Sequence, residues 1–199
     1  MLLAAALGCG SGSTRAATPA PARAAPPATA STSLDELMRG DLAEDRAITW
    51  TAARRLTWRD FQGPPPEDGA EGAMTSYTLY SAWKCRGANF EFRVIAGFRP
   101  RQSWVKAVVL NDSTQRRTVL GHEQTHFDIA EAHARVMRRA FGGLVRPCSM
   151  SDDELSDLAQ RLIQAEKAEQ RRYDAETNHG LRASQQAAWS ASVARRLRN

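Results

Sequence analysis

The pattern of hydrophobic and polar residues gives three runs in the middle of the chain the character of β-strands. They span 74–83, 90–98 and 103–110, and short connections that contain Gly or Pro separate them. Two shorter strand-like segments precede them at 48–50 and 56–58. Because short connections favour antiparallel neighbours, the pattern predicts a small antiparallel meander.

The rest of the chain shows helical periodicity, with apolar residues recurring every three or four positions. Capping boxes are formed by Ser33 with Glu36 and by Ser151 with Glu154, and the glycine pair at 142–143 is a stop signal. The expected helices span about 33–38, 113–141, 151–174 and 183–197.

With 199 residues, the chain has room for one domain with a real core and a tail. Residues 10–33 are mostly Ala, Pro, Ser and Thr, which bury little apolar area, so we expect a flexible tether before a single domain at 34–199. Residues 1–9 resemble the end of a bacterial lipoprotein signal, which predicts a lipidated Cys9 and a membrane tether.

The two other cysteines are expected to form a disulfide between Cys85 and Cys148. A closed loop of about 63 residues would stabilise the fold by roughly 4 kcal/mol in the chain-entropy model. This pairing favours an exported protein in the cell envelope, either periplasmic, on the surface or secreted. The alternative is a cytosolic protein with two unpaired thiols.

The formal net charge is +5 and the pI is about 9.6. Arginines supply most of the positive charge, but they are scattered, and the five tryptophans are not interleaved with basic runs. We therefore expect a solvated basic surface, attracted to anionic envelope surfaces, and no nucleic-acid partner. No apolar run is long enough to span a bilayer.

The motif His122-Glu123-x-x-His126 lies within the helix expected at 113–141. In a helix the two histidines lie one turn apart on one face, where both can bind one zinc ion beside Glu123. The chain has only four histidines, so a chance match is improbable by composition. The alternative is that the motif residues only solvate a surface helix.

A zinc hydrolase needs three protein ligands and an open position for water. His133 shares the stripe but lies about 10.5 Å from His126 along the axis, too far to bind the same ion. The third ligand is therefore expected from a distant segment. His179, in a helix break at 177–180, is favoured, with Asp174 and Glu176 as alternatives; His179 could instead bond helix-terminal carbonyls.

Further roles are predicted for residues around this motif. Glu123 is expected to act as general base on a zinc-activated water, and Tyr173 as a hydrogen-bond donor to the oxyanion. Asp128, Glu131 and Asp174 are candidates for acceptors that orient a ligating imidazole.

Several segments resemble one bacterial family, known as domain of unknown function 922, whose members are regarded as secreted zinc-dependent peptidases. The resemblance runs from about 45 to 195 and rests on 56–63, 103–105, 122–131, 173–180, Gln186 and Trp189. It implies a zincin-like α+β fold, with the catalytic helix packed beside a small sheet. It also draws attention to His179, but it implies no particular substrate.

The expected function is an exported zinc-dependent metallopeptidase with one zinc ion per chain and a peptide or protein substrate. One alternative is a zinc-binding envelope lipoprotein without catalysis, which would not need Glu123. Another is a structural envelope domain without metal.

Overall fold

The computed structural model describes residues 33–198, and these form an α+β domain, as predicted. The strands, all paired antiparallel, are β1 (Ile48–Thr49), β2 (Ala73–Met74), β3 (Tyr77–Arg86), β4 (Asn89–Phe98) and β5 (Trp104–Val105). A long β3–β4 hairpin, with β1 on the other edge of β4, forms the main sheet, while β2 and β5 form a separate ladder.

The helices are α1 (Leu34–Glu44), α2 (Ala107–Asn111), α3 (Ser113–Gly142), α4 (Asp152–Thr177) and α5 (Ala183–Arg198). Three of the helices match the predicted ones closely, α1 is longer than predicted, and α2 was not predicted. Both predicted capping boxes are confirmed, at Ser33 with Glu36 and at Ser151 with Glu154. The long helix α3 begins where the Asp112 carboxylate accepts hydrogen bonds from the amides of two residues in the first turn.

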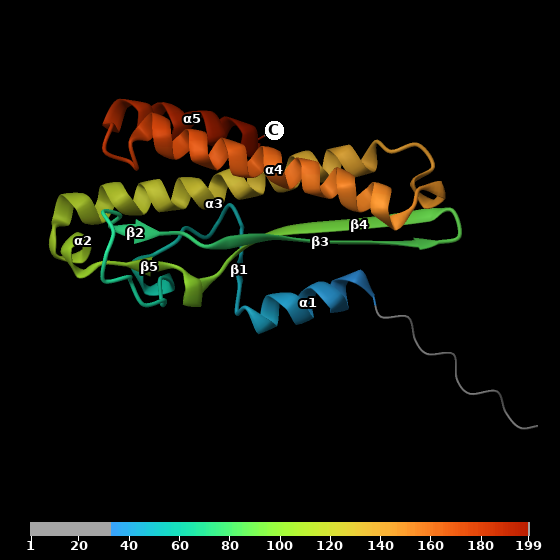
Figure 1. The fold of residues 1–199 in the computed structure, drawn as a ribbon, viewed down its shortest axis with the longest axis horizontal. Coiled ribbons are helices and arrows are strands. Elements are labelled where there is room, and N and C mark those ends of the chain that lie inside the picture. The colour runs from blue at the N-terminus through green and yellow to red at the C-terminus, as the bar shows by residue number, and fades with distance from the viewer. Residues whose placement is uncertain (1–32, 199) are drawn as a thin grey trace, which may run out of the picture. The chain divides into compact units, whose positions relative to one another are not determined.

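Helix α3 lies along one face of the β3–β4 hairpin, and α1 packs against the opposite face (Figure 1). Helices α4 and α5 lie on the outer side of α3. Residues 122–134 of α3 are therefore covered from both sides, and nearly all of them are buried. This arrangement places the predicted motif at the meeting point of three helices.

The core between α3 and the sheet follows from the two-residue period of β4. Val94, Ala96 and Phe98 lie at alternate positions and are buried against α3. On the same face Phe92 stacks on Phe141 of α3, with ring centroids 3.9 Å apart. Burial of each large side chain contributes about 1.5–3 kcal/mol, so this face fixes α3 on the sheet.

One predicted strand is wrong, a second is only partly a strand, and the predicted meander is therefore wrong. Residues 56–58 are not a strand, because Asp60 accepts from the Thr57 amide at 2.7 Å and closes a 3₁₀ turn over Trp58–Asp60. The run 103–110 pairs only through β5, and then turns into α2. Helix α2 buries Val109 against Gly72. A Cβ added at Gly72 would lie 2.6 Å from the Val109 side chain. Thus β5 pairs with β2, not with the hairpin.

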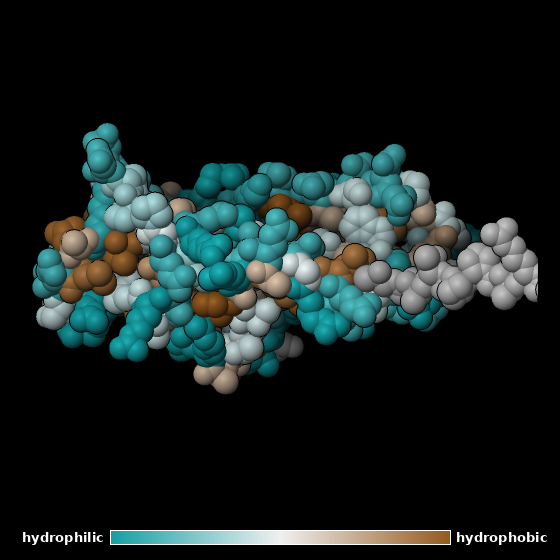
Figure 2. All heavy atoms as spheres, turned by 90° about the horizontal axis from the view of Figure 1, so that it is seen from below, coloured by the Kyte–Doolittle hydropathy of each residue, from teal (hydrophilic) through white to brown (hydrophobic). Residues whose placement is uncertain are grey.

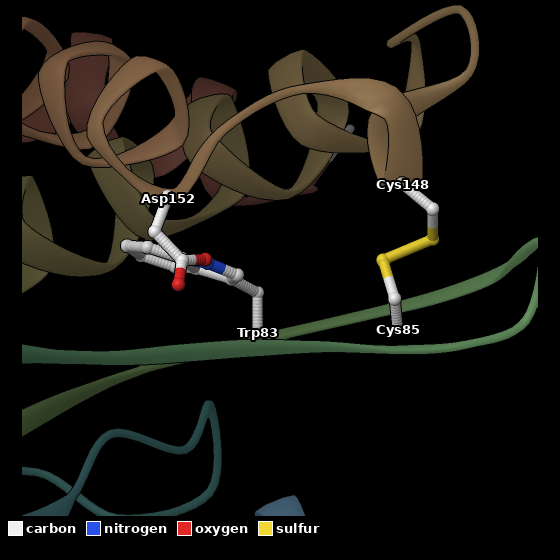
Figure 3. The surroundings of a disulfide bond; sticks show 4 residues. All are labelled: Trp83, Cys85, Cys148 and Asp152. Atoms are coloured by element: carbon white, nitrogen blue, oxygen red, sulfur yellow. A yellow bond between two sulfur atoms is a disulfide. The ribbon is translucent and has the colours of Figure 1, made fainter.

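A disulfide joins Cys85 on β3 to Cys148, just before α4, with the two Cα atoms 5.7 Å apart (Figure 3). Beside it the Trp83 indole donates a hydrogen bond to Asp152 at 3.2 Å (Figure 3). The two contacts link the part of β3 next to the hairpin turn to the start of α4.

Replacing both cysteines by serine should lower the free energy of unfolding by about 4 kcal/mol, because the bond closes a 63-residue separation in the unfolded chain. Urea denaturation of the double variant, compared with the oxidised and the reduced parent, measures this change. Equal stability of the three forms would contradict it.

The predicted signal segment with Cys9, and the tether up to residue 32, lie outside the described residues. Within residues 33–198, no helix is both long and apolar enough to cross a membrane.

Candidate metal centre

Three ligand atoms converge between α3 and α4. The Nε2 atoms of His122 and His126 lie 3.0 Å apart. Asp174 Oδ1 of α4 lies 3.1 Å from the first and 3.0 Å from the second. Among the described residues, this is the one group of three or more metal-ligating side chains whose ligand atoms all lie within 4.8 Å of one another.

Two glutamine side chains set the tautomers of these imidazoles. His122 Nδ1 lies 3.0 Å from Gln186 Oε1, and His126 Nδ1 lies 2.6 Å from Gln170 Oε1. The Gln170 amide nitrogen donates to the His126 carbonyl and to Glu166, so its oxygen must face the imidazole. Both Nδ1 atoms are therefore donors, which leaves each neutral ring with an unprotonated Nε2.

Two bare Nε2 atoms and a carboxylate oxygen have no hydrogen to share, so a proton or a cation must hold them together. A proton at His126 Nε2 fits this need: burial opposes the charged form of His126, but its hydrogen bond to Asp174 and the charge of Glu123 outweigh burial and raise its pKa. Burial is likewise outweighed at Asp174, where the neighbouring His122 and His126 lower the pKa of the carboxyl. Two imidazoles and a carboxylate are a ligand set that suits zinc.

Glu123 lies beside this group with an unsatisfied atom. Its side chain is buried, and its Oε2 has no hydrogen-bond partner among the described residues. A buried carboxylate oxygen without a partner is costly and indicates a place for a water or a ligand. A cleft of about 630 Å³ is lined by Glu123 and by His122, His126 and Asp174.

The structure groups Asp174, not the favoured His179, with the two imidazoles. Helix α4 continues to Thr177, so Asp174 still faces α3, whereas His179 falls in the turn after the helix with a φ of 52°. Its side chain is 61% exposed, and its Nδ1 lies 3.9 Å from Asp174 Oδ1. The other alternative, Glu176, accepts a hydrogen bond from Trp189. His179 lines the cleft but lies outside the three-ligand group.

Tyr173 does not have the predicted role of oxyanion donor. The residue is fully buried, and its hydroxyl lies 2.7 Å from Gln186 Oε1 and 3.2 Å from the His122 carbonyl. Its ring stacks on His122 with centroids 4.7 Å apart, and burial raises the pKa of the phenol. Tyr173 therefore positions His122 and Gln186 and does not face the cleft.

Two predicted orienting carboxylates do not contact the imidazoles of the motif either. Asp128 accepts from Trp50, Arg55 and Gln124, and Glu131 accepts from two arginines of the same helix, Arg135 and Arg138. Both lie on sides of α3 that face other elements, because helical rotation carries them away from the motif's stripe.

The sequence analysis missed the two glutamines that orient the imidazoles. Gln170 belongs to a series of buried polar residues on α4 with helical spacing, Glu166, Gln170, Tyr173 and Thr177. Because most residues at 166–177 are polar, no pattern in the sequence distinguishes this buried stripe from the exposed positions beside it. Gln186 was among the residues of the family resemblance, but no role followed from it.

Gly180 packs against the back of His122. Its φ is +84°, and an added Cβ would lie 3.1 Å from Cβ and Cγ of His122. A residue with a side chain would be strained there and would press on the ligating ring. The turn after α4 thus helps to hold the imidazole in place.

His133 has a structural role. It was excluded as a ligand because it lies too far from His126 along the helix. Its Nε2 lies 2.6 Å from Glu169 of α4, which also pairs with Arg196 of α5 at 2.5 Å. Burial opposes ionisation of Glu169, but its hydrogen bonds to His133 and Arg196 lower its pKa to about 2. This ion pair network joins α3, α4 and α5.

Comparisons with known proteins agree with the resemblance seen in the sequence. No curated protein and no solved structure matches the chain. A family described as bacterial protein of unknown function matches residues 58–180, which is more than half of the chain. The matched region includes β3 to α4 and ends at Gly180, so it contains every residue of the three-ligand group. The chain therefore belongs to the DUF922 family.

Proposed function

We propose that this protein is a zinc-dependent peptidase with His122, His126 and Asp174 as zinc ligands. One observation carries the proposal: three bare ligand atoms converge in a cleft, beside a buried carboxylate oxygen that has no partner. A structural zinc site would be closed by a fourth protein ligand, whereas a hydrolase keeps one position open. The open cleft at this group favours a hydrolase.

Zinc held by such a ligand set supplies a Lewis acid that activates water and polarises a carbonyl. Glu123 Oε2 is the group on this chain that can accept the proton of that water and pass it to the leaving amine. Gln170 and Gln186 keep both Nε2 atoms free of hydrogen, and Tyr173 holds His122 in place. The mechanism therefore needs one base and two ligand-orienting amides.

We further infer a zincin-like arrangement of the motif helix and the cleft. The helix α3 packs on an antiparallel sheet, and residues of β2 border the cleft. Strand β2 pairs only with β5 among the described strands, so its other edge is unpaired. An extended peptide can add to such an edge by backbone hydrogen bonds, which supports a peptide substrate.

The walls of the cleft favour substrates with a large apolar side chain. Met74, Val108 and Leu181 line it and are 38%, 61% and 79% exposed. They are half of the large hydrophobic residues exposed in the described part of the chain. Exposed apolar side chains gathered at one concave site indicate a binding surface.

We propose that the protein acts outside the cytoplasm, in the cell envelope or as a secreted protein. The disulfide between Cys85 and Cys148 supports this location, because such bonds persist in oxidising compartments. A lipid on Cys9 would tether the domain to a membrane.

Replacing Gln186 by Met should reduce zinc affinity by about 10–100-fold, because His122 Nδ1 loses the acceptor that fixes its tautomer. Competition with a chromophoric chelator measures the affinity. Gln185→Met, at the exposed neighbouring position, is the matched control and should bind zinc as the parent does. Unchanged affinity in Gln186→Met would show that the amide does not orient the ligand.

Removal and return of the metal test the proposed function. The full chain, purified without chelators, should contain one zinc ion and cleave a mixture of peptides that carry Leu, Met or Phe. Dialysis against 1,10-phenanthroline should abolish cleavage, and added zinc should restore it. Zinc without cleavage of any peptide would favour a non-catalytic zinc-binding protein, and absence of zinc would overturn the proposal.

A further inference from the structure

A second hollow, of about 730 Å³, lies on another side of the same helix. Its walls include Arg116, Arg117 and Leu120 of α3, which the three-ligand group does not use. On a helix these positions point about 130° away from the stripe of His122 and His126. The hollow is therefore separate from the metal-centre cleft.

The hollow is strongly basic. Arg59, Arg116 and Arg117 line it, and none of the described residues that line it is acidic. Among the described residues, no hydrogen bond, ion pair or ring contact engages these three guanidinium groups. Several other arginines of the domain are paired with carboxylates, such as Arg99 with Asp45 at 3.0 Å. Three unpaired like charges around one concavity repel each other, and a bound anion would relieve that repulsion.

The same hollow has an apolar wall. Trp58, Leu110 and Leu120 line it beside the arginines. Leu110 is 37% exposed, and Trp58 is held by a hydrogen bond from its indole to the Arg116 carbonyl at 3.0 Å. On the face seen in Figure 2, apolar surface gathers near the end of the domain where α2 lies in Figure 1, among mostly hydrophilic side chains. A ligand here meets both charge and apolar surface.

The hollow also gives a role to a motif that the metal centre does not use. Thr57, Trp58 and Arg59 belong to the segment 56–63, one of the segments of the family resemblance, and they lie far from the three-ligand group in sequence. The 3₁₀ turn closed by Asp60 presents Trp58 and Arg59 together at this hollow.

We propose that this hollow binds an organic phosphate, with the phosphate oxygens on the three arginines and the apolar part against Trp58, Leu110 and Leu120. Guanidinium groups bind phosphate through paired, charge-assisted hydrogen bonds, and three of them suit a group with several charged oxygens. The source of the phosphate is either a soluble ester or the headgroup of an anionic phospholipid.

Calorimetric titration of the full chain tests the site with phenyl phosphate as the probe and phenol as its neutral counterpart. In parallel, sedimentation with vesicles compares phosphatidylglycerol with phosphatidylcholine. We expect one of two results. Either phenyl phosphate binds with a Kd below about 1 mM, or the chain binds phosphatidylglycerol vesicles and does not bind phenyl phosphate. The first result assigns a soluble ester, and the second assigns a phospholipid headgroup.

Two double variants with the same charge change locate the binding. Arg116→Gln/Arg117→Gln should weaken it at least about tenfold. Arg139→Gln/Arg161→Gln, at exposed positions outside the hollow, should leave it unchanged. Equal weakening in both pairs would show that binding depends only on net charge, which would contradict a site in the hollow. If neither phenyl phosphate nor phosphatidylglycerol vesicles bound, the proposal would also be overturned. Because the positions are exposed, both pairs should fold.

Discussion

Asp174→Asn should weaken zinc binding by more than about 100-fold, because it removes the negative charge from a ligand that both imidazoles face. Asp174 Oδ1 lies within 3.1 Å of both Nε2 atoms, so no other described carboxylate is placed to replace it. Asn keeps the shape of the side chain, which separates loss of charge from loss of packing. Competition with a chromophoric chelator gives the affinity.

His179→Asn is the matched test, because His179 was the ligand that the sequence favoured. It is exposed, lies 3.9 Å from Asp174 and stays outside the three-ligand group, so its loss should change zinc affinity less than about threefold. The opposite result, with zinc lost in His179→Asn and kept in Asp174→Asn, would make His179 the third ligand. Loss in both variants would indicate that four protein ligands close the site, and this would weaken the case for hydrolysis.

The difference between these two candidates shows where sequence reasoning stops. The spacing of His122 and His126 is a local property of one helix, so the sequence was enough to pair them. The third ligand depends on where α4 ends and on how it is rotated against α3. The break predicted at 177–180 was correct, but Asp174 lies inside the helix and His179 beyond its end. Which side chain then faces α3 is a matter of packing, which no local pattern encodes.

The same limit explains the errors in the sheet. The long hairpin was predictable because two strand-like runs are separated by a short connection that contains Gly87, and the structure pairs ten residues of each strand. The run 103–110 is apolar but too short to distinguish a strand from a buried turn of helix. Burial of Val109 against Gly72 decided in favour of α2, and this contact joins residues far apart in sequence. Helix ends were more reliable, since a capping box is a local signal.

The need for side chains that orient the imidazoles was predicted, but neither their residue type nor their place was. A ligating imidazole needs an acceptor at Nδ1, and carboxylates of the motif helix seemed the nearest candidates. Asp128 and Glu131 are instead occupied by Trp50 and by arginines. The imidazoles are oriented instead by the amide oxygens of Gln170 on α4 and Gln186 on α5, which add no negative charge to the three-ligand group. This leaves Asp174 and Glu123 as the two carboxylates that lie with the imidazoles at the cleft, which Glu71 also lines.

Glu123→Gln should lower the rate of peptide cleavage by about 10²–10⁴-fold while the zinc content stays at one per chain. The substitution keeps the size of the side chain, but an amide cannot accept the proton that a carboxylate takes from water. Glu123 Oε2 has no partner among the described residues, so the variant breaks no hydrogen bond there. Steady-state cleavage of a Leu-containing peptide and metal analysis of the same sample measure both quantities.

Glu131→Gln is the control for this variant, since Glu131 is also a buried carboxylate of α3. Its oxygens are paired with Arg135 and Arg138, so the substitution should reduce stability but leave the rate per folded molecule within about twofold. If Glu123→Gln retained the parental rate, another group would be the base, and the partnerless oxygen at the cleft would need a different explanation.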